Sequence, residues 1–567
     1  MVGLAHVMSG SERGTRHEHP GGPAGHARDL YLYARRVRAD IEGLLASLAA
    51  LEQGGPDPHT KLGPELDRNL ELVQQATNHC DDVFVRHFRV GGDGPRAALI
   101  LAQTLPEKDL VADAVMNTLT HLIRIGRGET GYAEAIKAGL EQSGATVPQF
   151  EAEDELSGVV SDVMTGEAAV LVDGVPGALV FDVKKWPGRD VEEPMAETVT
   201  RGPRDGFVEQ ALTNIGLIRQ RMPVPDLKVR LLRIGRRSQT PVAVMYFQGI
   251  ADPDVVGEIQ RRLAMIDTDI IPADGYIEQF IEDRPLSPFP QLQVTERPDN
   301  VVMGLAQGRI AIIVNGSPFV LLAPTTIHDL LTSPEDYYHR PGFSTYVRAI
   351  RSIAWLLSVA GPGLFIALTS YHPQAIPTDL LITLESARAS VPFPPLVEVG
   401  LMLFAMEIIR EGAIRIPGQI GATIGIVGAL IMGQAAVQAG IVAPLAVIVV
   451  AATTLANYAV VNVELQQVLR FVQWGILLAS GVFGLLGFVI SGLVTLTHLA
   501  GLTSMGMPYL AGLVPPVSWR SRTPIIVRPV WERKERIRIR GPQELVKQSQ
   551  YSAYAEYRHA GGDRPPV

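Results

Sequence analysis

The hydrophobic and polar positions divide the chain into a mixed first part and a nearly uncharged second part. Residues 351–517 carry only 11 charged side chains, and 416–463 and 471–519 carry no Asp, Glu, Lys or Arg at all. Residues 352–378 form a third such stretch. Because about 20 apolar residues cross the hydrocarbon core of a bilayer as a helix, these stretches predict membrane spans. Three of them in one block exceed what a soluble core normally needs.

The lengths of these stretches predict four spans. One is Ile353–Tyr371, which we expect to be interrupted at Gly361-Pro362-Gly363. Two more fit into 416–463, with a turn at Ala443-Pro444, because the residue before a proline disfavours helical geometry. The fourth is Trp474–Leu499.

The charges that flank the spans predict their orientation. The N-terminus has no apolar segment of the kind found in a signal peptide. Arg348 and Arg351 precede the first span and a basic segment, 531–540, follows the last. The positive-inside rule therefore predicts both termini in the cytoplasm and an even number of crossings. The segment 376–415 remains open, either as a re-entrant or interfacial element or as an additional pair of crossings.

The first 350 residues contain an internal repeat. Val85–Gly91 matches Val229–Gly235 at an offset of 144 residues, and Val170–Pro176 matches Ile312–Pro318 at an offset of 142. Each copy has the pattern helix, strand, strand, helix and hairpin, and each hairpin contains Asp-Gly or Asn-Gly, a strong tight-turn signal. This pattern predicts two duplicated α+β subdomains in the cytoplasm, followed by an α-helical multi-pass membrane domain.

The predicted domain boundaries follow from these patterns. The predicted parts are a disordered or weakly helical N-terminal extension (1–60), α+β subdomain 1 (61–186), α+β subdomain 2 (187–345), a helical transmembrane domain (346–517) and a basic cytoplasmic tail (518–567). At the end of subdomain 2, Thr332–Tyr338 is typical of a helix N-terminus with acids in its first turn. It is either a plain helix start or a hinge or docking surface just ahead of the membrane.

Composition and motifs exclude several classes of function. Residues 1–350 carry 34 basic and 48 acidic side chains, which argues against a nucleic-acid binder. A single cysteine, Cys80, excludes intrachain disulfides and cysteine-based metal clusters. The sequence has no nucleotide-binding, metalloprotease or serine-hydrolase motif. We therefore expect no enzyme activity, no cofactor and no metal site.

The segment 394–415 places ionisable side chains among apolar ones. Such groups are costly at membrane depth unless they are paired or hydrated. On a helix many of them would lie three or four residues apart, within contact range. The segment is either an interfacial amphipathic helix or the lining of a pore or gate. Its candidate residues are Glu398, Glu407, Arg410, Glu411 and Arg415.

Two glutamines in the next apolar stretch also allow two interpretations, one structural and one functional. Gln434 and Gln438 lie among glycines and alanines, which let membrane helices approach closely. They are either part of a close-packed helix bundle or further candidate contacts for ions.

Long motifs in both halves of the chain carry a family resemblance. In the apolar half they are Val391–Pro394, Glu398, Glu407–Glu411, Ile414–Pro417 and Ile426–Val437. In the α+β half they are Glu193-Pro194, Arg201–Glu209, Ser287–Gln291, Thr295–Asp299, Gly308-Arg309 and Glu335–Tyr338. Together they resemble the A subunits of spore germinant receptors, the GerA family, from about residue 61 to about residue 515.

The resemblance implies a role in spore germination. Subunits of this kind lie in the spore inner membrane and act with a permease-like B subunit and a lipoprotein C subunit. The resemblance implies that the A subunit forms homo-oligomers and the ion channel, gated by nutrient bound to a partner. The alternatives are a membrane-anchored scaffold or coupling subunit without conductance, a membrane-bound enzyme, and a stand-alone transporter.

Overall fold

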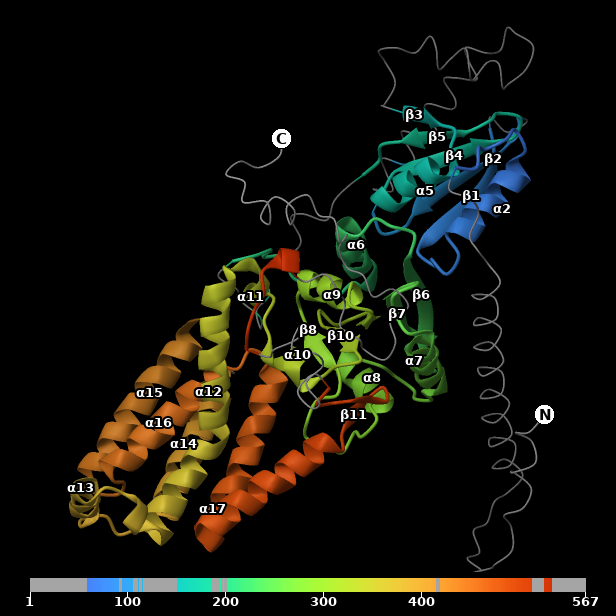
Figure 1. Ribbon diagram of the computed structural model, residues 1–567. Helices are drawn as coiled ribbons and strands as arrows, with labels where there is room; N and C mark the ends of the chain where they lie inside the picture. The colour runs from blue at the N-terminus through green and yellow to red at the C-terminus, as the bar shows by residue number, and fades with distance from the viewer. Residues whose placement is uncertain are drawn as a thin grey trace, which may run out of the picture. The chain divides into compact units, whose positions relative to one another are not determined.

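The computed structural model describes residues 59–90, 94–105, 111, 115, 150–184, 194, 197, 201–414, 419–511 and 525–532. The predicted N-terminal extension, apart from its last two residues, and most of the predicted basic tail lie outside these ranges. Figure 1 shows two β-sheets with their helices and a group of long helices.

The first sheet forms because short, β-branched segments alternate with glycine turns. Its strands follow the order β1-β2-β4-β5-β3, and all neighbours are antiparallel. The apolar positions of α2 face the sheet, and β4 and β5 are buried along their whole length. The elements are α2 (Leu66–Ala76), β1 (Val83–Arg89), β2 (Arg96–Ala102), β3 (Phe150–Glu153), α5 (Leu156–Thr165), β4 (Ala168–Val172) and β5 (Ala178–Phe181).

The second sheet has the same strand order as the first, β6-β7-β9-β10-β8. Its helices pack on a core of Val, Ile and Leu side chains. The elements are α6 (Ala211–Arg221), β6 (Leu227–Ile234), β7 (Thr240–Phe247), α7 (Pro253–Met265), α8 (Asp274–Ile281), β8 (Gln293–Thr295), α9 (Pro298–Leu305), β9 (Ile310–Val314), β10 (Val320–Ala323), α10 (Ile327–Leu331) and α11 (Glu335–Tyr338).

The repeat extends to individual hydrogen bonds. Asn69 donates to the Gly63 carbonyl and accepts from its amide, and Asn214 does the same with Val208. These buried asparagines fix the chain just before each first helix. Because side-chain bonds of this kind are specific in geometry, two matching sets are strong evidence for two copies of one unit.

One strand in each copy was not predicted from the sequence. β3 and β8 each pair with the second strand of the hairpin, at the edge of the sheet. β8 has only three residues and β3 alternates with glutamates. Segments this short lack the length on which an apolar period can be recognised.

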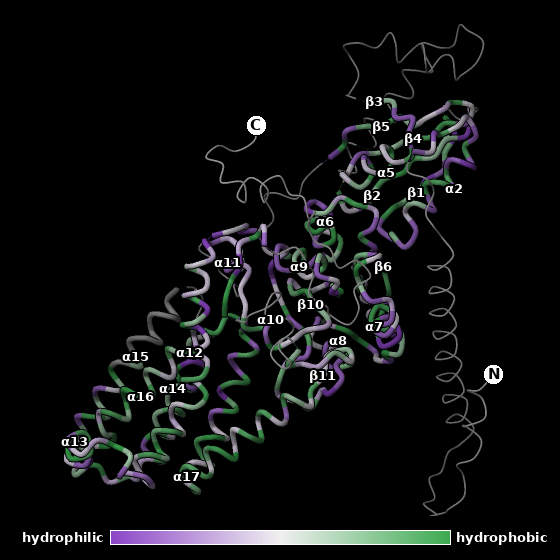
Figure 2. The backbone as a smooth tube through the Cα atoms, in the orientation of Figure 1, coloured by the Kyte–Doolittle hydropathy of each residue, from purple (hydrophilic) through white to green (hydrophobic). Residues whose placement is uncertain are grey.

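The apolar half of the chain consists of helices, which Figure 2 shows as largely hydrophobic. Two described stretches, Pro341–Tyr371 and Val463–Ala500, are long and apolar enough to cross a membrane, with mean hydropathies of 1.7 and 2.3. The elements are α12 (Pro341–Ile366), a π-helical turn η1 (Ala367–Tyr371), a short 3-10 turn η2 (Pro373–Ala375), α13 (Thr378–Arg388), α14 (Pro395–Ile414), α15 (Gln419–Gln438), α16 (Pro444–Tyr458) and α17 (Val463–Ala500).

The predicted interruption at Gly361-Pro362-Gly363 is wrong, because α12 continues through Pro362. The glycines serve close packing instead. A Cβ at Gly361 would lie 2.7 Å from Thr453 of α16, and one at Gly363 would lie 2.7 Å from Ile476 of α17. The predicted turn at Ala443-Pro444 is confirmed, since α16 begins there.

The predicted span Trp474–Leu499 is not one continuous helix. α17 is broken at Gly484, whose φ of 60° and ψ of −139° are open to glycine but not to other residues. The hydroxyl of Tyr371 donates to the Gly481 carbonyl at 2.6 Å just before the break. Leu465 and Leu499, near opposite ends of α17, belong to one apolar cluster. A straight helix of 38 residues would separate its ends by about 57 Å, so α17 is a helical hairpin, as Figure 1 also shows.

The returning arm of this hairpin is bonded to the second α/β subdomain. His498 and Ser287 lie within hydrogen-bond distance, 2.8 Å between Nε2 and Oγ. Beyond the helix, a two-stranded hairpin, β11 (Thr503–Ser504) and β12 (Met507–Pro508), continues the contact. There Thr503 donates to Asp283 at 2.6 Å, and Ser504 donates to the Gln291 carbonyl at 2.6 Å.

Candidate functional site

A buried carboxylate joins the α/β part to α12. Asp336, 2% exposed, accepts hydrogen bonds from Arg348 Nε at 2.7 Å and from Arg351 Nη1 at 2.8 Å. The Arg348 guanidinium also lies 5.4 Å from the centroid of the Tyr337 ring. Two positive charges thus share one buried carboxylate, whose removal would leave Arg348 buried without its counter-charge. The two arginines that the sequence placed at the membrane boundary are therefore attached to the preceding segment.

Tyr338, two residues after Asp336, connects this joint between the α/β part and α12 to the core of the second subdomain. Tyr338 donates to Asp299 at 2.7 Å, and Asp299 pairs with the buried Arg297 at 2.8 Å. Burial, followed by the hydrogen bond to Asp299 and then the charge of Asp299, raises the pKa of Tyr338, so the phenol remains a donor. Gly202 has a φ of 132°, and a Cβ there would lie 2.7 Å from the Tyr338 ring. Three motifs far apart in sequence therefore meet ahead of α12.

Glu197 completes this side of the joint. Its carboxylate accepts a hydrogen bond from Thr295 Oγ1 at 2.5 Å, and its carbonyl accepts one from Arg297. Burial raises the pKa of Glu197 to about 7, because removal from water disfavours the charged form. This carboxyl group therefore changes its charge near neutral pH.

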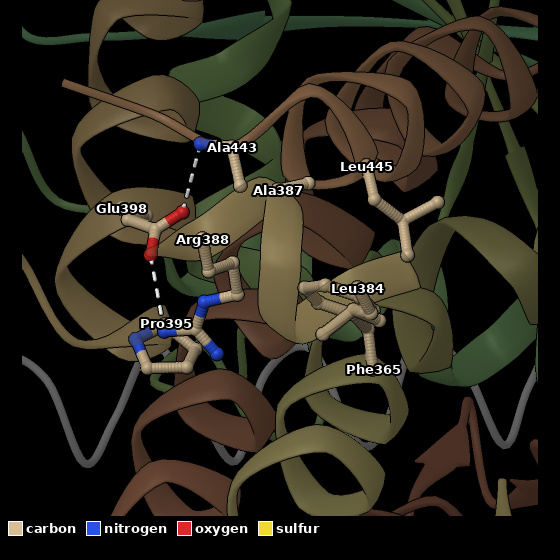
Figure 3. A pocket seen from close by; sticks show the side chains of 8 residues that line it. All are labelled: Phe365, Leu384, Ala387, Arg388, Pro395, Glu398, Ala443 and Leu445. Atoms are coloured by element: carbon tan, nitrogen blue, oxygen red, sulfur yellow. Dashed lines mark hydrogen bonds and ion pairs between the residues drawn. The ribbon is translucent and has the colours of Figure 1, made fainter. Parts of the chain in front are cut away.

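Among the described residues that were predicted for a pore or gate, Glu398 is the most deeply buried. It is 2% exposed, accepts from Arg388 Nη2 of α13 at 3.2 Å and from the Ala443 amide at the start of α16 at 3.1 Å. Figure 3 shows these two bonds beside a cavity of about 20 Å³, roughly the room for one water molecule. Phe365, near the end of α12, lines the same cavity. Glu398 therefore fastens the start of α14 to the ends of α13 and α16, beside the end of α12.

A second charged cluster lies further along α14. Glu407 accepts from Arg410 Nη1 at 2.8 Å and lies 3.5 Å from Nε of Arg470 on α17. The Arg410 guanidinium lies 5.6 Å from the centroid of the Tyr458 ring on α16, a favourable cation–π arrangement. Two arginines thus share one carboxylate between three helices, which leaves a net positive charge there.

The structure brings together only part of the predicted set. Glu407 and Arg410 are in contact, whereas Glu398 lies nine residues away on α14, about 13 Å along its axis. Glu411 is exposed on α14, and Gln434 and Gln438 are exposed on α15. Arg415 lies outside the described residues.

The sequence did not single out the partners Arg388, Arg470 and Tyr458. Both arginines are among the 11 charged residues of 351–517, so scarcity of charge was the available signal. Asp336 lay in a segment left open as a hinge. As to metals, within the ranges that the structure describes no group of three or more His, Cys, Asp or Glu is placed to hold an ion.

The fold and these junctions define a protein with a repeated α/β part bonded directly to long apolar helices. A family model, described as Bacillus/Clostridium GerA spore germination protein, matches residues 71–539. This chain belongs to that family, and the resemblance seen in its motifs is confirmed.

Individual relatives agree with the family. The chain is 35% identical to "Spore germination protein KA" of Bacillus subtilis (strain 168) over 86% of this chain and 89% of that protein. It is 34% identical to "Spore germination protein B1" of the same strain over 86% and 100%. A crystal structure of the N-terminal domain of the A subunit of the Bacillus megaterium spore germinant receptor GerK3 is 30% identical, covers 47% of this chain and 98% of that chain, and has a TM-score of 0.37.

Proposed function

We propose that this chain is the A subunit of a nutrient germinant receptor in the spore inner membrane and forms its ion channel. Membership of the GerA family and the curated germination proteins that share most of its length support the role in germination. In this proposal the chain assembles as a homo-oligomer. Nutrient binding to a permease-like B subunit opens the channel, and a lipoprotein C subunit completes the receptor.

The path of the helices supports six crossings. The ends of α12, α13, α14 and α16 that meet around Glu398 define one level. The other end of α16, with Tyr458, lies beside Arg410 and Arg470 and defines the opposite level. In this proposal α12, α14, α15, α16 and the two arms of α17 each cross the membrane once, which gives an even number of crossings. Both termini then lie in the cytoplasm, and the chain is a multi-pass membrane protein.

The observation that carries the channel proposal is the cluster of Glu407, Arg410 and Arg470 between apolar helices. The cluster lies at one end of the proposed crossings, between α14, α16 and α17, and a simple anchor has no need of three charges packed between helices there. Rings of such side chains around a symmetry axis are how pores select and gate ions. The hydrogen bonds of Asp336 connect the α/β part firmly to α12, so that in this proposal a movement of one part moves the other.

The test is ion flux through the purified full chain in liposomes. Glu407→Gln removes the carboxylate that two arginines share but keeps the shape of the side chain. We expect the conductance to change at least tenfold, because the net positive charge between the helices rises. Glu385→Gln, an exposed carboxylate on α13, is the matched control and should leave the flux unchanged.

The alternative is a scaffold or coupling subunit that carries no current itself. It predicts no conductance at any protein density and normal germination of spores that carry Glu407→Gln. We expect no catalytic activity from either form of the protein. A turnover found with the purified chain would contradict both proposals.

A further inference from the structure

The loop 284–290 presents a leucine to the outside from a well-ordered turn. Leu286 is 99% exposed. The Arg284 amide donates to Gln291 Oε1 at 2.8 Å, and Gln291 Nε2 donates back to the Arg284 carbonyl at 2.7 Å. The Ser287 amide donates to the same carbonyl at 3.0 Å. These hydrogen bonds fix the backbone of the turn, and the fixed backbone leaves the Leu286 side chain exposed.

This loop lies at the point where the last membrane helix ends. Ser287 and His498 are 2.8 Å apart, and the rings of Phe289 and His498 are 5.9 Å apart between centroids. The turns of α17 just before His498 expose Leu493 and Leu496. Leu286 is thus one residue from a group bonded to the end of a helix whose outer face is apolar.

The helix before the loop also exposes large aromatic side chains. Tyr276 and Phe280 stand four residues apart on α8, on one face, and both are about half exposed. Tyrosine is enriched where a membrane meets water, and phenylalanine is common on the apolar face of helices that lie in the interface.

The charges near the loop favour anionic headgroups. Arg284 is exposed. The adjacent acids are engaged on the protein side. Glu282 accepts from the Gln291 amide at 2.9 Å, and Asp283 pairs with Arg262 and accepts from the Gly506 amide. What faces outward is therefore a cation among apolar side chains, the combination that binds a lipid interface.

We propose that Tyr276, Phe280, Arg284 and Leu286 form a lipid-contact surface that rests on the cytoplasmic leaflet of the bilayer. The proposal depends on the proposed membrane insertion of α17. In it, Leu286 and the aromatic rings enter the interface while Arg284 meets lipid phosphate. The second α/β subdomain is then attached to the membrane at this surface as well as through α12.

A single-cysteine label tests the surface in the full chain. Cys80→Ser removes the native thiol and keeps a donor for the Pro225 and Leu227 carbonyls. In this background Leu286→Cys carries a bimane label, and the protein is reconstituted into liposomes of phosphatidylglycerol and phosphatidylcholine. Brominated lipids and aqueous iodide serve as quenchers. We expect brominated lipid to reduce the fluorescence at least twofold and iodide to have little effect.

Two control positions separate this surface from the membrane insertion itself. Leu493→Cys on α17 should be quenched by brominated lipid, and Gln74→Cys on the exposed side of α2 should be quenched by iodide alone. If lipid quenches the Leu493→Cys label but not the Leu286→Cys label, the proposed lipid-contact surface is wrong, whereas the proposed membrane insertion of α17 is supported. A Leu286→Cys label shielded from both quenchers would instead indicate a covering protein and would also overturn the proposal. If lipid quenches neither position, the insertion of α17 fails too.

Discussion

At the scale of residues, Asp336 shows how one carboxylate can organise a junction. Its two oxygens accept from different arginines, Arg348 and Arg351, which lie one turn apart on α12. Hydrogen bonds between ionised groups are short and strong. With almost no water around it, the carboxylate is also the principal compensation for two charges near the start of α12, an apolar helix long enough to cross a membrane.

Asp336→Asn should destabilise the protein by about 3–5 kcal/mol, because Arg348 would remain buried without its counter-charge. Thermal unfolding of the purified full chain measures this loss. Asp379→Asn, at an exposed position on α13, is the matched control and should cost less than about 1 kcal/mol. Equal unfolding temperatures for the two variants would show that the joint contributes little.

At the scale of elements, glycines decide how the long helices pack and where they end. Gly363 lets α17 approach α12, because a Cβ would lie 2.7 Å from Ile476 and 2.9 Å from the Ser480 hydroxyl. Gly484 has a different role, since its backbone angles turn α17 back on itself. Tyr371 occupies the space that a side chain at 484 would need. Small residues thus replace side-chain interlocking, as is common in membrane bundles.

Gly484→Ala should destabilise the hairpin by about 1–3 kcal/mol from backbone strain, with a further cost from contact with Tyr371. The midpoint of thermal unfolding in detergent should fall accordingly. Gly492→Ala lies on the returning arm, where a Cβ meets nothing within 4 Å, and should be neutral or slightly stabilising. A Gly484→Ala protein as stable as the parent would contradict the hairpin geometry.

At the scale of the whole molecule, the two α/β copies are joined by a fully buried ion pair. Arg219 of α6 donates to both oxygens of Asp82, at 2.8 and 2.9 Å, and neither side chain is exposed. The chain next to Asp82 forms a parallel bridge between Cys80 and Val229, which adds it to the edge of the second sheet. The two copies are therefore connected in two ways: by this ion pair, and by a backbone bridge at the edge of the second sheet.

Arg219→Met should cost about 3–5 kcal/mol, because Asp82 would be left charged in an apolar setting. The double variant Arg219→Met/Asp82→Leu should recover most of that loss, since replacing a buried pair by apolar side chains is often close to neutral. Unfolding of the full chain by denaturant measures both. Additive losses in the double variant would mean that the two side chains do not act as a pair.

Much of this architecture could be predicted from the sequence, and the missing parts have physical reasons. The repeat was visible because its glycine turns and apolar strands keep a steady spacing. The edge strands β3 and β8 were missed because they are short and polar. The break at Gly484 was missed because the apolar pattern is the same on both sides of one backbone angle. The partners of Glu407 and Glu398 depend on helix packing, which spacing along one chain does not encode.

The hairpin of α17 acts mechanically as a lever with its grip in the α/β part. One end is held by Leu465, which packs in an apolar cluster with Ile327 and Leu330, and the other by the contact of His498 with Ser287. The outgoing arm, from Val463 to the bend, is about 31 Å long. A rotation of the grip by about 5° would therefore move the tip, and Tyr371 beside it, by about 3 Å. That displacement is comparable to the width of a dehydrated cation, so a small turn of the α/β part is enough to change the packing around Tyr371 at the far end of the hairpin.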